Sequence, residues 1–90
     1  MEHQNKRTST LNEAVKLING DREAAYGKPS ENFERVASGW RVILGADVTP
    51  SQVALCLSWL KASRIINTPT HEDSYIDMAA YVALAAELAE

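Results

Sequence analysis

The stretch TPSQVALCLSWLKASRIIN, residues 49–67, constrains the fold more than any other part of the chain. It opens with a strong helix-start signal: Thr49 suits the N-cap, Pro50 suits the first helical position, and Gln52 completes a capping box. Apolar residues then surround nearly the whole circumference of the predicted helix. A helix that is apolar all round lies at the centre of a domain or in an interface between subunits, so we expect one of these two positions.

Three further segments, residues 10–20, 30–45 and about 71–88, combine start signals, apolar spacing and stop signals of helices. The first opens with a capping box of Thr10 and Glu13 and ends at Asn19-Gly20. Ser30 suits the cap of the second, and Gly45 suits its C-terminal stop. The sequence therefore predicts four helices.

Two further signals mark the connections between these helices. Tyr26-Gly27 and Pro29 interrupt any helix between the first two segments and predict a turn there. Thr70, after the break at residues 67–70, suits the cap of the last helix, which runs to about Leu88.

The predicted fold class is all-α, because no segment shows the sustained alternation of a strand. Short connections between the last three helices favour antiparallel neighbours. We therefore predict a single domain, residues 1–90, with a frayed tail at residues 1–8. Its form is a small antiparallel bundle of three main helices, with the short N-terminal helix packed across it or swapped onto a partner chain. A chain of 90 residues buries only about two thirds of its unfolded surface, so we expect a homo-oligomer.

Charge and hydropathy exclude several classes of function. The net charge is −3, which gives no basic field for nucleic acid. The longest strongly apolar run, VALCLSWL, is too short to span a bilayer, and MEHQNKRTST lacks the apolar core of a signal peptide, so we expect a cytoplasmic protein with no membrane partner. The single Cys56 excludes an intramolecular disulfide and a cysteine zinc cluster, and we expect it to be a buried structural thiol.

Four charged residues flank the turn between the last two helices. Lys61 and Arg64 are three apart near the end of one helix, and Asp73 and Asp77 are four apart near the start of the next. A helical hairpin brings both pairs close together. One interpretation is a set of structural ion pairs, which are common and individually weak. The other is an anion and metal site, in which the carboxylates bind Mg²⁺ and the cations bind phosphates.

A second acidic pair, Glu31 and Glu34, lies three apart in SENFERV. Magnesium prefers hard oxygen ligands, and carboxylates from two helices of a bundle can supply them. The alternative is a solvated helix face, because Glu31 and Arg35 have the spacing of a surface ion pair.

The turn AAYGKPSENF brings an aromatic, a cation and an amide, Tyr26, Lys28 and Asn32, just before a helix N-terminus. Such termini bind anions, and an aromatic ring can stack on a base. The alternative is a simple turn in which Tyr26 is a hydrophobic lid.

Three segments together, DREAAYGKPSENFERVASGW, ALCLSWLKASRI and HEDSYIDMAAYVALAAE, resemble a family of small, largely uncharacterised phage and bacterial proteins. The shared order is Tyr-Gly, Asn-Phe, Trp, Lys-x-x-Arg, Asp-x-x-x-Asp and Tyr, over about residues 21–87. That family is distantly similar to the all-α nucleoside triphosphate pyrophosphohydrolases of the MazG type. Those proteins form dimers or tetramers and use Mg²⁺ held by acidic helix residues to cut between the α- and β-phosphates.

The resemblance implies roles for six residues, and the hypothesis of a nucleotide site adds four. Glu31 and Glu34 match the Glu-x-x-Glu metal motif, and Asp73 with Asp77 stand in for the later Glu-x-x-Asp. Lys61 and Arg64 become the catalytic cations that hold phosphates. The expected substrate-binding residues are Tyr26, Lys28, Asn32 and Tyr81. The chain departs from the MazG pattern in its Asp-x-x-x-Asp spacing, its longer gap between acidic pairs and its short first helix.

Two functional hypotheses follow. The first is a MazG-like, Mg²⁺-dependent nucleoside triphosphate pyrophosphohydrolase or nucleotide-binding protein. The second is a non-catalytic phage-type helical module that binds a host protein or sequesters a ligand, with Trp40 and Trp59 as candidate anchors. Carboxylates that converge on one pocket favour the first, whereas carboxylates each matched by Arg or Lys favour the second.

Overall fold

The computed structural model describes residues 5–90, apart from the side chain of Asp21, and this range is helical with no strand. The elements in chain order are α1 (Lys6–Lys16), the π-helical segment η1 (Leu17–Arg22), α2 (Glu23–Tyr26), α3 (Pro29–Leu44), α4 (Pro50–Asn67) and α5 (Glu72–Leu88). The prediction of an all-α chain is confirmed. None of the helices in the described range is long and apolar enough to cross a membrane.

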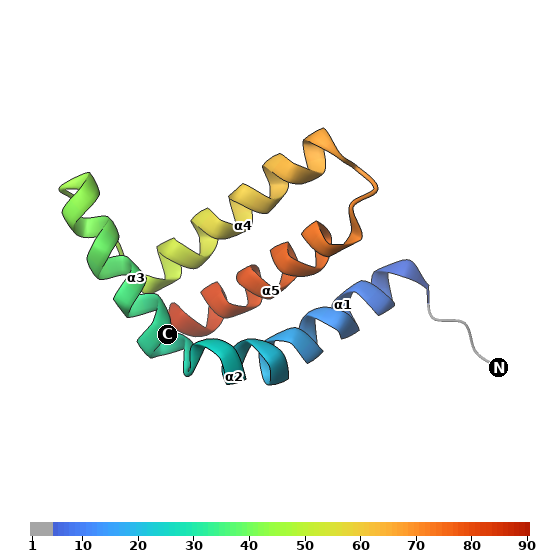
Figure 1. The fold of residues 1–90 in the computed structure, drawn as a ribbon, viewed down its shortest axis with the longest axis horizontal. Helices are drawn as coiled ribbons and strands as arrows, with labels where there is room; N and C mark the ends of the chain where they lie inside the picture. The colour runs from blue at the N-terminus through green and yellow to red at the C-terminus, as the bar shows by residue number, and fades with distance from the viewer. Residues whose placement is uncertain (1–4) are drawn as a thin grey trace.

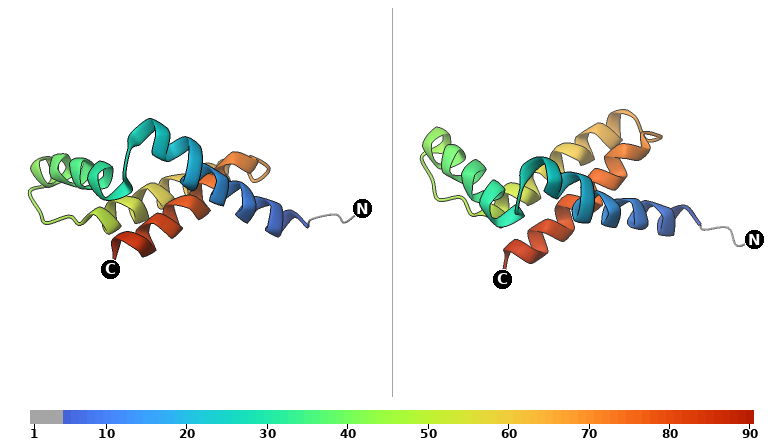
Figure 2. Two further views of the ribbon diagram at one scale, coloured as in Figure 1. Left: turned by 90° about the horizontal axis from the view of Figure 1, so that it is seen from below. Right: turned by 60° about the horizontal axis from the view of Figure 1, so that its bottom comes forward.

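Helices α4 and α5 form an antiparallel hairpin joined by a turn at residues 68–71, and their contact is the most extensive in the chain (Figure 1). Helix α1 and η1 pack along α5, and α2 continues the helical path from η1 towards α3 (Figure 2). Helix α3 contacts the start of α4 and then diverges from the hairpin (Figure 1). The chain is 52 Å long but only 29 and 22 Å across. The sequence predicts that all three main helices pack antiparallel in one bundle. In the single chain, α4 and α5 pack in this way, and α3 diverges from them.

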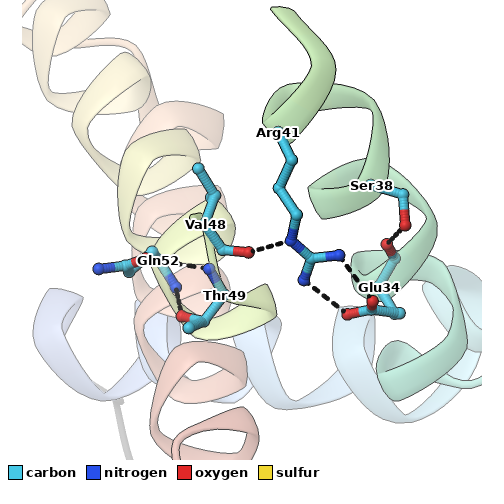
Figure 3. Close-up of polar contacts among 6 residues, drawn as sticks. All are labelled: Glu34, Ser38, Arg41, Val48, Thr49 and Gln52. Carbon is cyan, nitrogen blue, oxygen red and sulfur yellow. Dashed lines mark hydrogen bonds and ion pairs between the residues drawn. The ribbon is translucent and has the colours of Figure 1, made fainter. Parts of the chain in front are cut away.

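Helix α4 begins with the predicted capping box (Figure 3). The Thr49 side chain accepts a hydrogen bond from the backbone N–H of Gln52 at 3.1 Å, and the Gln52 side chain accepts one from the backbone N–H of Thr49 at 2.9 Å. This reciprocal capping box satisfies two backbone donors that the first turn leaves without partners. Pro50 occupies the first turn, where a missing N–H has no cost. Both ends of α4 agree with the prediction.

Two glycines end helices because each has a positive φ that other residues adopt with strain. Gly27, after α2, has φ +80°, and Gly45, after α3, has φ +64° in the left-handed helical region. The predicted break at Tyr26-Gly27 and the predicted stop at Gly45 are both confirmed.

The N-terminal helix differs from the prediction at both ends. It begins at Lys6, where the Asn5 side chain accepts a hydrogen bond from the backbone N–H of Thr8 at 2.9 Å. Thr10 therefore lies inside the helix, and its hydroxyl donates to the carbonyl oxygen of Lys6 at 2.8 Å. Of the predicted frayed tail, residues 5–8 cap and open this helix, and residues 1–4 lie outside the described range.

The predicted stop at Asn19-Gly20 is also wrong, because the helix continues through η1 into α2. Gly20 does not adopt the positive φ that a glycine stop requires. Two helix starts shift by one or two residues: α3 begins at Pro29 after Lys28, and α5 begins at Glu72 after His71.

The core lies where α3, α4 and α5 meet. Its fully or nearly fully buried members are Phe33, Ala37, Val53, Ala54, Leu84 and Ala85. Phe33 is its largest side chain, and half of the set is alanine, which lets the helix backbones approach closely.

The expectation that Cys56 is buried is wrong, because α4 turns Val53, Ala54 and Ser58 inward and leaves Cys56 exposed. Position 56 lies roughly 160° from position 54 around a helix that turns 100° per residue. The apolar composition of α4 concealed this difference between its faces.

Candidate functional site

An ion pair joins the two helices of the hairpin, between its middle and its turn. The Lys61 ammonium on α4 lies 2.9 Å from a carboxylate oxygen of Asp77 on α5. The two side chains are 15% and 31% exposed, so this is the least exposed of the ion pairs among the described residues. The hairpin thus brings together one cation and one carboxylate of the predicted site.

A second cation, Arg22, lies beside this pair and was not predicted. Its guanidinium carbon lies 4.8 Å from the ring centre of Tyr26, 5.0 Å from that of Phe33 and 5.4 Å from that of Tyr81. Arginine is attracted to aromatic faces at such distances. Arg22 is the last residue of η1, and π-helical turns occur often at functional sites. The sequence signal was only its four-residue spacing from Tyr26, since Phe33 and Tyr81 come from other helices.

A small cavity connects Arg22 with the ion pair. Its volume is about 30 Å³, and it is lined by Leu17, Arg22, Asp77, Ala80, Tyr81 and Leu84. This volume suffices for about one water molecule, and Arg22, Asp77 and Tyr81 supply polar partners for it. Lys61 thus pairs with Asp77, Asp77 shares the cavity with Arg22 of η1, and Arg64 lies one helical turn from Lys61 on α4. We call these four residues the charged row.

The outer end of the charged row opens into a pocket beside the α4–α5 turn. This pocket has a volume of about 380 Å³ and is lined by Ser63, Arg64, Asn67, Thr68 and His71. The lining offers one permanent cation and several hydrogen-bond donors, and it contains no carboxylate. The Nδ1 atom of His71 is hydrogen-bonded to the Ser74 hydroxyl at 2.8 Å, so its Nε2 atom is the one that could contact a ligand. The chemistry of this lining suits an anion.

The predicted metal ligands divide into two sets. Asp73 and Asp77 share one face of α5, one turn apart. Glu34 on α3 instead binds Arg41, whose two terminal nitrogens lie 3.0 and 3.2 Å from the two carboxylate oxygens (Figure 3). The hydrogen bond from Arg41 lowers the pKa of Glu34 below its ordinary value of 4.5. Glu31 is exposed.

Arg41 also tethers the α3–α4 connection, because its Nε donates to the carbonyl oxygen of Val48 at 2.9 Å. The Glu34–Arg41 pair therefore has a structural role in orienting α3 against the start of α4. Sequence analysis interpreted Glu34 only through its spacing from Glu31 and gave Arg41 no role.

Magnesium fits only part of the predicted ligand set. Within the described residues no group of three or more metal-ligating side chains gathers in one place, so Glu31 and Glu34 do not join the Asp73–Asp77 pair in one chain. Mg²⁺ commonly binds through one or two carboxylates together with substrate phosphates. Asp73 and Asp77 suit that mode of binding.

The predicted substrate-binding residues lie in different places. Tyr26 and Tyr81 meet at Arg22. Lys28 instead lines a pocket of about 450 Å³ that also contains Glu87 and Glu90. Asn32 is half-buried on α3. Only the two tyrosines join the charged row.

These features define an all-helical domain with a charged site on a helical hairpin. Over residues 9–89 the sequence matches the family described as Domain of unknown function (DUF6378), and the chain belongs to that family. The expected membership of an uncharacterised family is therefore confirmed, while the likeness to the MazG type stays a prediction.

Two curated relatives come from bacteriophages. The Gene 55 protein of Mycobacterium phage L5 is 36% identical over 77 residues, which cover 84% of this chain and 49% of that protein. The Gene 55 protein of Mycobacterium phage D29 is 35% identical over 82 residues, which cover 91% of this chain and 54% of that protein. The chain thus spans about half the length of these relatives. No solved structure matches it significantly.

Proposed function

We propose that this protein binds the phosphate groups of a nucleotide along the charged row. The observation that carries the proposal is that Lys61 and Arg22 both lie beside Asp77, while Arg64, one turn from Lys61, lines the anion-suited pocket at the turn. On this side of the hairpin the three cations of the charged row outnumber the two carboxylates, Asp73 and Asp77, although the chain carries a net charge of −3. Phosphates are bound by such groupings of lysine and arginine.

The span of the site suits an extended ligand. His71 and Tyr81 are ten positions apart on α5, which corresponds to roughly 15 Å along a helix. Arg64 and His71 would bind the terminal phosphates, and Lys61 would exchange part of its contact with Asp77 for a phosphate oxygen. Tyr81 and Tyr26, held beside Arg22, would contact the base or sugar.

The activity we propose is Mg²⁺-dependent pyrophosphohydrolysis of a nucleoside triphosphate, as the resemblance to the MazG type implies. Asp73 and Asp77 would hold the metal, which would polarise a phosphoryl group and lower the pKa of a bound water. Lys61 and Arg64 would stabilise charge on the leaving pyrophosphate. The proposal leaves Glu31 and Glu34 outside the row.

A non-catalytic interaction module is the second candidate function, and a specific observation favours it. Two of the predicted metal ligands already have cation partners: Asp77 pairs with Lys61, and Glu34 pairs with Arg41. Carboxylates matched in this way are the pattern expected of structural ion pairs.

Release of pyrophosphate separates the two functions. The protein is incubated with Mg²⁺ and each common ribo- and deoxyribonucleoside triphosphate, and the products are resolved by phosphorus NMR. We expect monophosphate and pyrophosphate from the wild type and neither from Asp77→Asn, with the helical circular dichroism retained. The control is Lys16→Gln, which removes an exposed ion pair with Glu13 and leaves the charged row intact. No product with any nucleotide, or full activity in Asp77→Asn, would refute the catalytic proposal.

A further inference from the structure

We propose that a second copy of this chain packs on the outer side of α4, antiparallel to it, and forms a homodimer that does not depend on nucleotide binding. The surface is the α4 stripe, which we define as Leu55, Trp59, Ala62 and Ile66. These residues recur at intervals of four, three and four, which is the spacing of an apolar seam between two packed helices.

One chain leaves the three large residues of the α4 stripe without cover, whereas the small Ala62 is half-buried. Leu55, Trp59 and Ile66 are 52%, 73% and 78% exposed, while Val53 and Ala54 on the inner side of the same helix are fully buried. Single exposed apolar residues are ordinary on a protein surface, but three large ones aligned on one helix face mark an interaction site.

The charge pattern of α4 agrees with an interface. Lys61 and Arg64 are the two charged residues of this helix, and neither belongs to the α4 stripe. Gln52 and Ser63 flank the stripe and are uncharged. Interface cores are depleted in charge and enriched in aromatic residues, of which Trp59 is the example here.

The chain exposes more surface than a compact monomer of its mass. The accessible surface is 6365 Å². A compact monomer of this mass, 9.9 kDa, has about 5,200 Å² by the usual scaling of surface with mass. The difference, of the order of 1,000 Å², belongs to the whole elongated chain, which measures 52 by 29 by 22 Å. It is large enough to include the roughly 800 Å² that each partner buries in a standard interface. The symmetry of the α4 stripe is what identifies a second copy as the occupant.

The symmetry of the α4 stripe sets the direction of packing. Its four-three-four spacing reads the same from either end, so two antiparallel copies related by a two-fold axis match each other. Leu55 then faces the partner's Ile66, and Trp59 faces the partner's Ala62. The second contact sets the largest side chain of the stripe against the smallest, as close helix packing requires.

Sedimentation equilibrium of three variants tests the surface. We expect the wild type and Val42→Glu to be dimers and Trp59→Glu to be a monomer with unchanged helical circular dichroism. Val42 is the matched control because it is 84% exposed on α3, outside the α4 stripe. Ile66→Glu repeats the test should Trp59→Glu fail to fold. A monomeric wild type, a dimer that survives both α4 substitutions, or loss of the dimer in Val42→Glu alone would overturn the proposal.

Oxidative cross-linking tests the direction, in a Cys56→Ser background that removes the exposed native thiol. The double variant Leu55→Cys/Ile66→Cys should form covalent dimers, and Leu55→Cys alone should not. Cross-linking of Leu55→Cys alone to the same extent would show parallel helices and overturn the antiparallel arrangement.

Discussion

The Lys61–Asp77 pair offers the sharpest stability prediction, because it joins the two helices that carry the site. The perturbation is a double-mutant cycle of Lys61→Met, Asp77→Asn and both together. The cycle isolates the free energy that the two side chains contribute jointly. We expect each single change to destabilise the fold and the double change to cost less than the sum.

The magnitude follows from the geometry. At 2.9 Å and an effective dielectric constant of about 20, the Coulomb attraction is about 6 kcal/mol before desolvation is subtracted. Fully exposed pairs retain up to about 1 kcal/mol, and breaking a buried pair costs about 3 to 5 kcal/mol. With exposures of 15% and 31%, the pair lies between these cases. We therefore expect a coupling free energy of about 1 to 2 kcal/mol.

Urea unfolding of the four proteins, at one fixed protein concentration, measures the coupling. For a small domain, 1 kcal/mol moves the midpoint by up to about 1 M, so the expected coupling is well resolved. A coupling below about 0.3 kcal/mol would show that water screens the pair, and it would refute the inference that the hairpin holds Lys61 against Asp77.

Three further predictions concern other parts of the fold. Phe33→Ala should cost about 3 to 5 kcal/mol in urea unfolding, because it empties the centre of the core, where Phe33 is fully buried; a cost below about 1 kcal/mol would contradict that position. The pKa of Glu34 is lowered in the folded state, so its stabilising effect is fully present above pH 4.5 and is lost as the pH falls through the lower folded-state value. Glu34→Gln should therefore make the free energy of unfolding fall less steeply as the solution is acidified. An unchanged dependence on pH would contradict the pairing with Arg41. Gly39→Ala should stabilise α3 by about 0.5 to 1 kcal/mol, whereas Gly45→Ala should destabilise it by about 1 kcal/mol because Gly45 has a φ of +64°. The melting temperature should therefore rise in the first variant and fall in the second. Shifts of the same sign would contradict the assigned ends of α3.

Local chemistry made the helix ends around α4 predictable. The capping box of Thr49 and Gln52 and the left-handed Gly45 depend on residues within a few positions of each other, so sequence reasoning found them. Asn19-Gly20 also carries the local signal of a helix stop. The helix nevertheless continues through these two residues, because η1 packs against α5. Tertiary contacts override local propensity in such segments.

The candidate site was predictable only where a turn or helix repeat fixes it. The proximity of Lys61 and Asp77 follows from a short hairpin, and the shared face of Asp73 and Asp77 follows from helix geometry. The position of Arg22 could not be predicted, because it depends on a π-helical turn and on rings from two other helices. The inner and outer faces of α4 could not be distinguished either, because both are apolar.

Calorimetric titration with a non-hydrolysable nucleoside triphosphate analogue, with and without Mg²⁺, tests the central claim most directly. The proteins compared are the wild type, Arg64→Gln and the control Lys16→Gln. A charged hydrogen bond to phosphate contributes about 1.5 to 3 kcal/mol, so the account predicts saturable binding that is at least about ten-fold weaker in Arg64→Gln and unchanged in Lys16→Gln. No binding by the wild type, or equal affinity in Arg64→Gln, would contradict the assignment of the charged row as a phosphate site.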